Sequence, residues 1–192
     1  LNLSSLQFKH CNMILFRLRH WQAFLLIFIL PFALQYSLTQ LTHGFPWYVS
    51  LLLNSLPTLV PTLWLWQVGR LLHRRLPASI KISPLYFHLG ALYFAAYILV
   101  LIYTLGIVRD NLAEGMLPLG PLVLLLPMHL FATFCYLYLV YFVARSVVSV
   151  EQQRIVALNE YIFPLLQAMF LPVGIWFLQP RLNRLCSEST IC

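Results

Sequence analysis

Long runs of apolar residues, separated by short polar turns, dominate this chain. Five runs contain no Asp, Glu, Lys or Arg, and they cover residues 21–41, 46–69, 84–108, 117–144 and 161–179. A helix needs about 20 mainly apolar residues to cross the hydrocarbon layer of a membrane, and each run reaches or approaches this length. The pattern predicts an all-α, polytopic membrane bundle of about five transmembrane helices.

The turns between the runs are too short to fold as separate domains. We therefore expect one membrane domain over 21–179, a short basic segment over 1–20 and a short tail over 180–192. Residues 1–12 are more polar than the run after them, and Met13 opens a short basic lead into that first apolar run. We expect residues 1–12 to lie upstream of the true start of the protein.

The fifth run is the weakest of the predicted spans. It is short, and it contains Pro164 and Pro172, which remove backbone hydrogen bonds from a helix interior. We expect residues 161–179 to cross the membrane; the alternative is a re-entrant or interfacial segment. A segment that returned to the side it started from would favour a permease over a purely structural protein.

The stretch between the fourth and fifth runs mixes apolar and polar residues. Residues 145–161 read RSVVSVEQQRIVALNEY. This spacing is compatible with an amphipathic helix along the membrane surface. It is equally compatible with a fourth helix that continues beyond the membrane.

The composition excludes an ordinary soluble domain. Hydrophobic residues make up 61% of the chain and charged residues only 9%, whereas soluble domains carry roughly 25% charged residues. The formal charge is +7, but the basic residues stand in small groups between apolar runs. This arrangement indicates membrane topology and gives no support for a nucleic-acid partner.

The basic residues also predict an orientation. With the amino end in the cytoplasm, nine of the 12 Lys and Arg residues fall on the cytoplasmic side. The other three, Arg109, Arg181 and Arg184, then fall outside. Since Lys and Arg near span ends are retained in the cytoplasm, we expect a multi-pass inner-membrane protein with a cytoplasmic amino end.

One basic loop is a candidate contact for lipid head groups. It follows the second run and carries Arg70, Arg74, Arg75 and Lys81. Anionic lipids attract each such charge by about 1 kcal/mol. The alternative is that these residues only enforce topology.

Within the spans, histidines are the ionisable residues that qualify as functional candidates, since Asp, Glu, Lys and Arg are missing from them. The same gap argues against a carboxylate proton relay, a voltage sensor or an intramembrane metalloprotease. His20 and His88 lie near the cytoplasmic ends of two predicted spans and could bind haem or a transition metal. The alternative is that they are ordinary interfacial histidines with no cofactor.

Prolines and amides in the spans suggest a cavity. Broken helices near the midplane expose backbone groups to a substrate in secondary transporters. The polar side chains that could line such a cavity are Asn54, Gln67, His129 and Gln167. The alternative is that the prolines shape packing and that these side chains form hydrogen bonds between helices.

Two segments resemble a known group of proteins. The runs RHWQAFLLIFILPF, residues 19–32, and FLPVGIWFLQPRLNRL, residues 170–185, are similar to the two ends of small multi-pass inner-membrane proteins of bacteria. That group has no assigned activity. The resemblance implies a bacterial inner membrane and a defined end to the last segment, and it transfers no catalytic residue.

The sequence favours a non-enzymatic role. We expect an accessory or structural membrane subunit in the lipid bilayer that packs against a second copy of itself or a membrane protein partner. One alternative is a small-solute permease with a cavity at the proline-broken helices. Another is a haem-binding or redox membrane protein. Nucleotide and hydrolase motifs are missing from the chain.

Overall fold

The computed structural model describes residues 18–41, 46–77, 80, 83–116 and 119–188. These residues form helices and no strand, which confirms the predicted all-α bundle. Four helices are long and apolar enough to cross a membrane. The first is made of α1 (His20–Phe24), the π-helical turn η3 (Leu25–Ile29) and α2 (Leu30–Leu41), and the others are α3 (Trp47–His73), α4 (Pro84–Ala113) and α5 (Leu119–Gln152).

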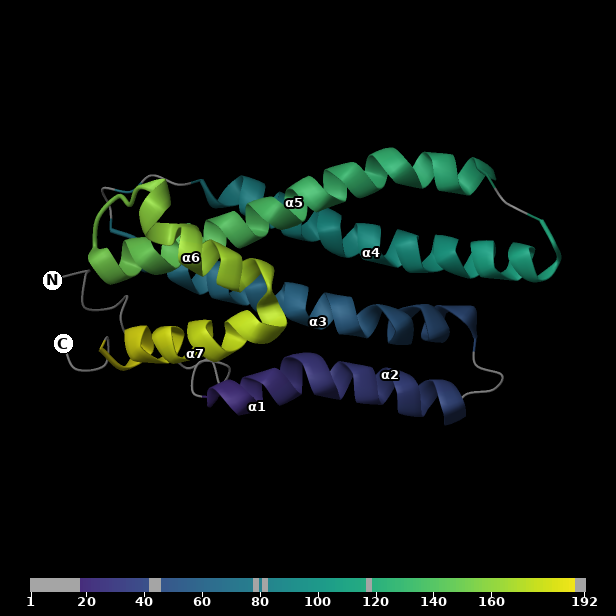
Figure 1. Ribbon diagram of the computed structural model, residues 1–192, viewed down its shortest axis with the longest axis horizontal. Coiled ribbons are helices and arrows are strands. Elements are labelled where there is room, and N and C mark those ends of the chain that lie inside the picture. The colour runs from purple at the N-terminus through teal and green to yellow at the C-terminus, as the bar shows by residue number, and fades with distance from the viewer. Residues whose placement is uncertain (1–17, 42–45, 78–79, 81–82, 117–118, 189–192) are drawn as a thin grey trace, which may run out of the picture.

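The four long helices lie roughly side by side (Figure 1). The connections from α2 to α3 and from α4 to α5 lie at one end of the bundle, which we call the turn end. Helix α1 begins, and α3 and α5 end, at the other, which we call the basic end.

Prolines explain two local features. Pro31 has no N–H for a helical hydrogen bond, and the preceding residues Leu25–Ile29 widen into a π-helical turn. Helix α4 begins where its sequence predicts, at Pro84, whose missing N–H costs nothing in a first turn. The hydroxyl of Ser83 caps this helix by accepting from the N–H of Leu85 at 3.4 Å.

Helix α5 continues past the fourth apolar run as far as Gln152. Residues 145–152 therefore continue α5 and do not form a separate surface helix. This end of α5 is the most buried part of the bundle, because α3, α4 and α6 pack around it. Leu139, Val143 and Val147 have no exposed surface.

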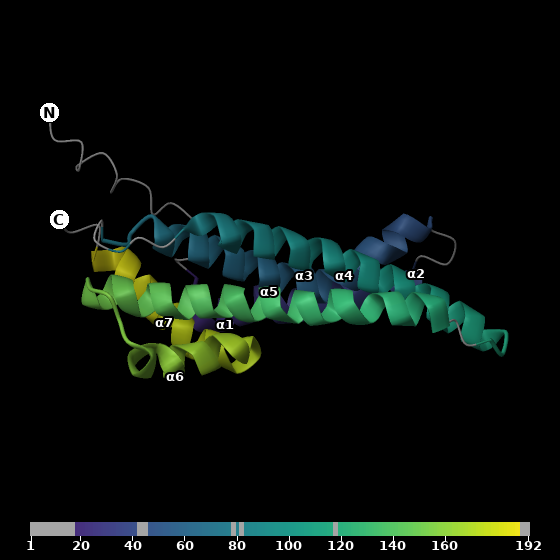
Figure 2. The same cartoon turned by 90° about the horizontal axis from the view of Figure 1, so that it is seen from above.

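The fifth apolar run is not one helix, and the prediction of a continuous fifth span is wrong. It divides into α6 (Leu158–Met169) and α7 (Leu171–Glu188), with Phe170 between them at φ −99° and ψ 60°. The two helices form a hairpin, and α7 returns to the basic end, where α6 began (Figures 1 and 2). The re-entrant alternative describes this geometry better than a crossing does.

Two residues after the break explain the hairpin. Pro172 has no N–H to continue α6, and in a continuous helix its ring would clash with the carbonyl group four residues earlier. Gly174 packs directly on the carbonyl group of Gln167, where a Cβ atom would overlap the oxygen. Its N–H donates to the carbonyl oxygen of Phe170 at 2.7 Å. The turn therefore needs both residues.

The main core lies between the basic end and the hairpin. The rings of Phe87 and Phe142 stack with 4.3 Å between centroids. Phe87 also covers Gly69, at which a Cβ atom would overlap the ring. A glycine on α3 thus lets α4 approach closely.

Polar contacts tie α7 to the rest of the basic end. Arg181 makes a two-pronged ion pair with Glu151 of α5, with Nε 2.8 Å from Oε1. Asn183 Nδ2 donates to the carbonyl oxygen of Leu18 at 2.9 Å. Hydrogen bonds to ionised groups are stronger than neutral ones, so the ion pair is the firmest of these links.

Arginines are distributed unevenly between the two ends. Of the nine arginines that the structure describes, only Arg109 lies at the turn end. Because α7 returns in the hairpin, Arg181 and Arg184 also lie at the basic end. The arginines on that side are Arg19, Arg70, Arg74, Arg75, Arg145, Arg154, Arg181 and Arg184.

Candidate functional site

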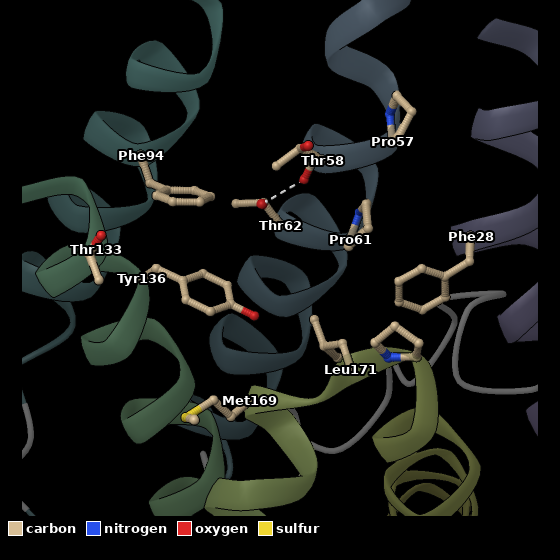
Figure 3. Close-up of a pocket in the computed structure, with 11 residues that line it drawn as sticks. Phe28, Pro57, Thr58, Pro61, Thr62, Phe94, Thr133, Tyr136, Met169 and Leu171 are labelled. Carbon is tan, nitrogen blue, oxygen red and sulfur yellow. Dashed lines mark hydrogen bonds between the residues drawn. The ribbon is translucent and has the colours of Figure 1, made fainter. Parts of the chain in front are cut away.

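A cavity of about 300 Å³ lies where the tip of the hairpin meets the bundle (Figure 3). We call it the central cavity. Helix α3 and the hairpin tip supply most of its wall, and α5, α4 and η3 supply the rest. Its lining residues are Phe28, Pro57, Thr58, Pro61, Thr62, Phe94, Thr133, Tyr136, Met169, Leu171 and Pro172.

Two side chains of this cavity, Tyr136 and Thr58, carry hydroxyls that form no hydrogen bond among the described residues. The hydroxyl of Tyr136 points into the space between α3 and the hairpin tip (Figure 3), and it has no hydrogen-bond partner among the described residues. The hydroxyls of Thr62 and Thr133 are occupied, because they donate to the carbonyl oxygens of Thr58 and His129 at 2.8 and 2.9 Å. Tyr136 is therefore available to a bound molecule.

The prolines of α3 add backbone acceptors. Pro57 and Pro61 lack N–H groups, so the carbonyl groups of Leu53 and Pro57 lose their helical donors. Such freed carbonyls must find another partner inside a membrane. The described wall of the cavity thus combines the hydroxyls of Tyr136 and Thr58, and Pro57 with its freed carbonyl, with apolar surface, and it carries no Asp, Glu, Lys, Arg or His. This lining suits a small uncharged molecule.

A second cavity, of about 540 Å³, lies at the turn end between α2, α3 and α4. We call it the end cavity. Asn54 sits in its wall and links two helices, since its Oδ1 accepts from Gln35 Nε2 at 2.9 Å. Arg109 and Asp110 also line it and form an exposed ion pair with each other. The end cavity is the more polar of the two.

The two cavities follow one another along the same stripe of α3. Four polar residues recur at every fourth position, and Ser50 and Asn54 line the end cavity while Thr58 and Thr62 line the central one. Residues four apart lie on one helix face. Asn54 was the only member of this stripe that sequence reasoning singled out, although the four-residue spacing was present in the sequence.

The other predicted cavity residues lie elsewhere. Gln67 and His129 line neither cavity. His129 instead joins α5 to α4, with its Nδ1 2.6 Å from the hydroxyl of Tyr97. Gln167 lies on α6 just before the hairpin tip, and its buried Oε1 has no hydrogen-bond partner among the described residues.

The structure does not bring His20 and His88 together as a ligand pair. The ring of His20 lies 4.9 Å from that of Trp176, on α7. His88 is bonded to α3, because its Nδ1 accepts from Trp66 Nε1 at 2.8 Å. Helix α1 packs on α7 and η3, whereas α4 packs on α3 and α5.

The residues of the predicted head-group loop lie in different surroundings. Arg70 lies over the ring of Trp66, with 5.7 Å between its Cζ and the ring centroid, and Arg74 is exposed. Arg75 turns inward and donates to the carbonyl oxygen of Leu185 at 2.9 Å. Burial lowers the pKa of Arg75 below its usual value. Lys81 lies outside the described residues.

Fold and cavities together define the class of this protein. Four helices apolar enough to cross a membrane, with a helical hairpin packed among them, make it a multi-pass helical membrane protein. No family model, curated protein or solved structure matches the chain. Its function must therefore be argued from its own residues.

Proposed function

We propose that this chain is a small permease of the bacterial inner membrane that admits a small uncharged solute. The observation that carries the proposal is the alignment of two cavities along one polar stripe of α3, with the hairpin tip at the central cavity. Transporters place their binding sites near the midplane, where helices are interrupted by proline and backbone acceptors are free. The central cavity lies against α3, a continuous helix in which Pro57 and Pro61 leave two carbonyl groups without their helical donors.

The orientation follows from the arginines. Eight of the nine described arginines lie at the basic end, which we assign to the cytoplasm. A fifth crossing would have put Arg181 and Arg184 outside, against the distribution of the other basic residues. A returning α7 puts them on the same side as the other arginines of the basic end. Both α1 and α7 then have their outer termini on the cytoplasmic side. The bacterial assignment rests on the resemblance of residues 19–32 and 170–185.

The cavities suggest a route. A solute enters the end cavity beside Asn54 and passes along Thr58 to the hydroxyl of Tyr136. Between the central cavity and the basic end, the close packing of Leu139 and Val143 blocks the passage of a solute. Met169 and Leu171 of the hairpin tip border the central cavity, so movement of the tip is the step that opens this side.

The test is solute flux into liposomes that contain the purified protein. Stopped-flow light scattering with glycerol and with urea should give faster swelling than protein-free liposomes. Thr58→Phe fills the central cavity and should remove the added rate. Leu63→Phe is the matched control, because Leu63 is on the same helix, lines neither cavity and is 51% exposed. Asn54→Leu should also lower the rate.

Two results would contradict the permease. One is flux with both solutes equal to that of empty liposomes at every protein density tested. The other is an equal loss of flux in Thr58→Phe and Leu63→Phe, because the effect would then come from folding and not from the cavity. Far-UV circular dichroism of each variant separates these cases.

A second candidate function is the accessory membrane subunit. In this role the outward-facing apolar side chains of the α5 segment near the turn end would contact a partner in place of lipid. Val123 is 70% exposed, Leu124 68% and Leu130 64%. A partner recovered in stoichiometric amount from mild detergent, together with no solute flux, would favour this role over the permease.

A further inference from the structure

A hydrogen bond joins α3 to α4 near the basic end, at the outer flank of the bundle. Trp66 Nε1 donates to His88 Nδ1 at 2.8 Å. Because Nδ1 accepts this bond, the neutral imidazole carries its proton on Nε2, which becomes a donor. Both rings are half-buried. The bond thus fixes two rings side by side and leaves one N–H of His88 for another partner.

Arg70 adds a fixed positive charge to the same place. Its Cζ lies 5.7 Å from the centroid of the Trp66 ring, one helical turn closer to the basic end. A guanidinium over an indole face is held by cation–π attraction and keeps its five N–H donors. Arg70 and Arg74, a turn further on, have no ion pair among the described residues. Both side chains remain available to an anion.

Apolar side chains continue from this group toward the middle of the bundle. Leu63 lies one turn before Trp66 on α3, and Leu89 and Leu92 follow His88 on α4. They are 51%, 52% and 68% exposed. In a membrane these leucines face acyl chains, while Trp66 and Arg70 lie nearer the head groups, as aromatic and basic residues commonly do at membrane interfaces.

From this arrangement we propose that Arg70, Trp66 and His88 form a binding site for the phosphate of one anionic phospholipid in the cytoplasmic leaflet. The fixed side chains present donors and a positive charge, which match phosphate oxygens. They offer no carboxylate to the ammonium group of a zwitterionic lipid. The exposed leucines then contact the acyl chains of the same lipid.

This site is separate from the two cavities, so it does not depend on the permease proposal. The site also reduces the set of residues predicted to contact lipid head groups, because Arg75 donates to the carbonyl oxygen of Leu185 and is not free for lipid. Trp66 becomes a positioning residue for both Arg70 and His88, since it holds the first by its ring face and the second by its N–H.

The test is lipid binding to the purified full chain in detergent, measured by native mass spectrometry. Dioleoyl phosphatidylglycerol should form a one-to-one complex about tenfold more tightly than dioleoyl phosphatidylcholine. Arg70→Gln should remove this preference. Arg154→Gln is the matched control, since it removes the same charge from the same end and should change binding by less than about twofold.

A second variant addresses the arrangement and not only the charge. Trp66→Phe keeps an aromatic ring but removes the donor to His88, and it should weaken phosphatidylglycerol binding while the retention volume and helicity stay unchanged. Equal losses in Arg70→Gln and Arg154→Gln would overturn the site, because binding would then follow total charge. Equal affinity for the two lipids, or displacement of lipid by equimolar glycerol 3-phosphate, would overturn it too.

Discussion

Replacing Gly174 with alanine tests the hairpin, on which both the four-span fold and the central cavity depend. The added Cβ atom would overlap the carbonyl oxygen of Gln167 and would lie 3.1 Å from its Cα. Non-bonded carbon atoms pack best at about 3.5–4.0 Å, so even the Cα atom of Gln167 would be too close. Because the obstacle is backbone and not the end of a flexible side chain, α6 and α7 would have to separate at their tip.

The sign of the effect distinguishes this structure from a straight helix. Glycine inside a helix is less favourable than alanine by about 1 kcal/mol, so an uninterrupted span would become more stable on substitution. Overpacking a rigid contact costs typically about 1–3 kcal/mol and sometimes more. We expect Gly174→Ala to lower the free energy of unfolding by about 3 kcal/mol, because the clash outweighs the gain in helix propensity.

The assay is unfolding by sodium dodecyl sulfate in mixed micelles, followed by far-UV circular dichroism. Gly106→Ala in α4 is the control, since a Cβ atom there would meet nothing within 4 Å. This control should be neutral or slightly stabilising. If Gly174→Ala were as stable as Gly106→Ala, the hairpin would be wrong and residues 161–179 would form a continuous helix.

Single contacts lead to three further predictions. Phe87→Ala leaves a cavity in the main core and should cost about 3–5 kcal/mol in the same unfolding assay; a cost under about 1 kcal/mol would mean that the ring is not buried. Glu151→Gln removes the ion pair with Arg181 and should cost about 0.5–1 kcal/mol at low salt and less at high salt. An effect independent of salt would argue against the pair. Tyr97→Phe removes the hydrogen bond to His129 and should cost about 1 kcal/mol, whereas His129→Leu in a Tyr97→Phe background should add little, as a double-mutant cycle would reveal.

Charge-free length was sufficient to find the four long helices, because an apolar run of about 20 residues has few alternatives in a membrane. The same criterion gives the bounds of a membrane span and not the ends of its helix. The second and third runs stop at Gly69 and Val108, each directly before an arginine, but α3 and α4 continue to His73 and Ala113. Helical hydrogen bonds persist beyond the hydrocarbon layer, and a count of apolar residues does not detect them.

The hairpin could be suspected from the sequence, but the sequence alone did not establish it. Pro172 marks a possible break, yet prolines also occur inside α3 and α5, which remain continuous. The additional signal is Gly174, whose role depends on the position of Gln167 after the chain has turned back. A contact that exists only in the folded turn leaves no periodic pattern in the sequence.

For the candidate sites, as for the hairpin, the sequence pointed to single residues and not to their contacts. Histidines stood out because ionisable side chains are costly within a membrane, but their partners could not be named. His88 and His129 bond to Trp66 and Tyr97 on neighbouring helices. Which donor faces which acceptor depends on helix rotation and depth, and hydropathy specifies neither.

The most direct test of the returning hairpin is the side of the membrane on which Cys186 lies. Labelling with a membrane-impermeant thiol reagent would be compared in three single-cysteine proteins that lack the other native cysteines. One retains Cys186, and the others carry Arg154→Cys at the basic end or Glu114→Cys at the turn end. We predict that Cys186 and Arg154→Cys react only after the cells are permeabilised, whereas Glu114→Cys reacts in spheroplasts. Labelling of Cys186 from the same side as Glu114→Cys would contradict the returning hairpin.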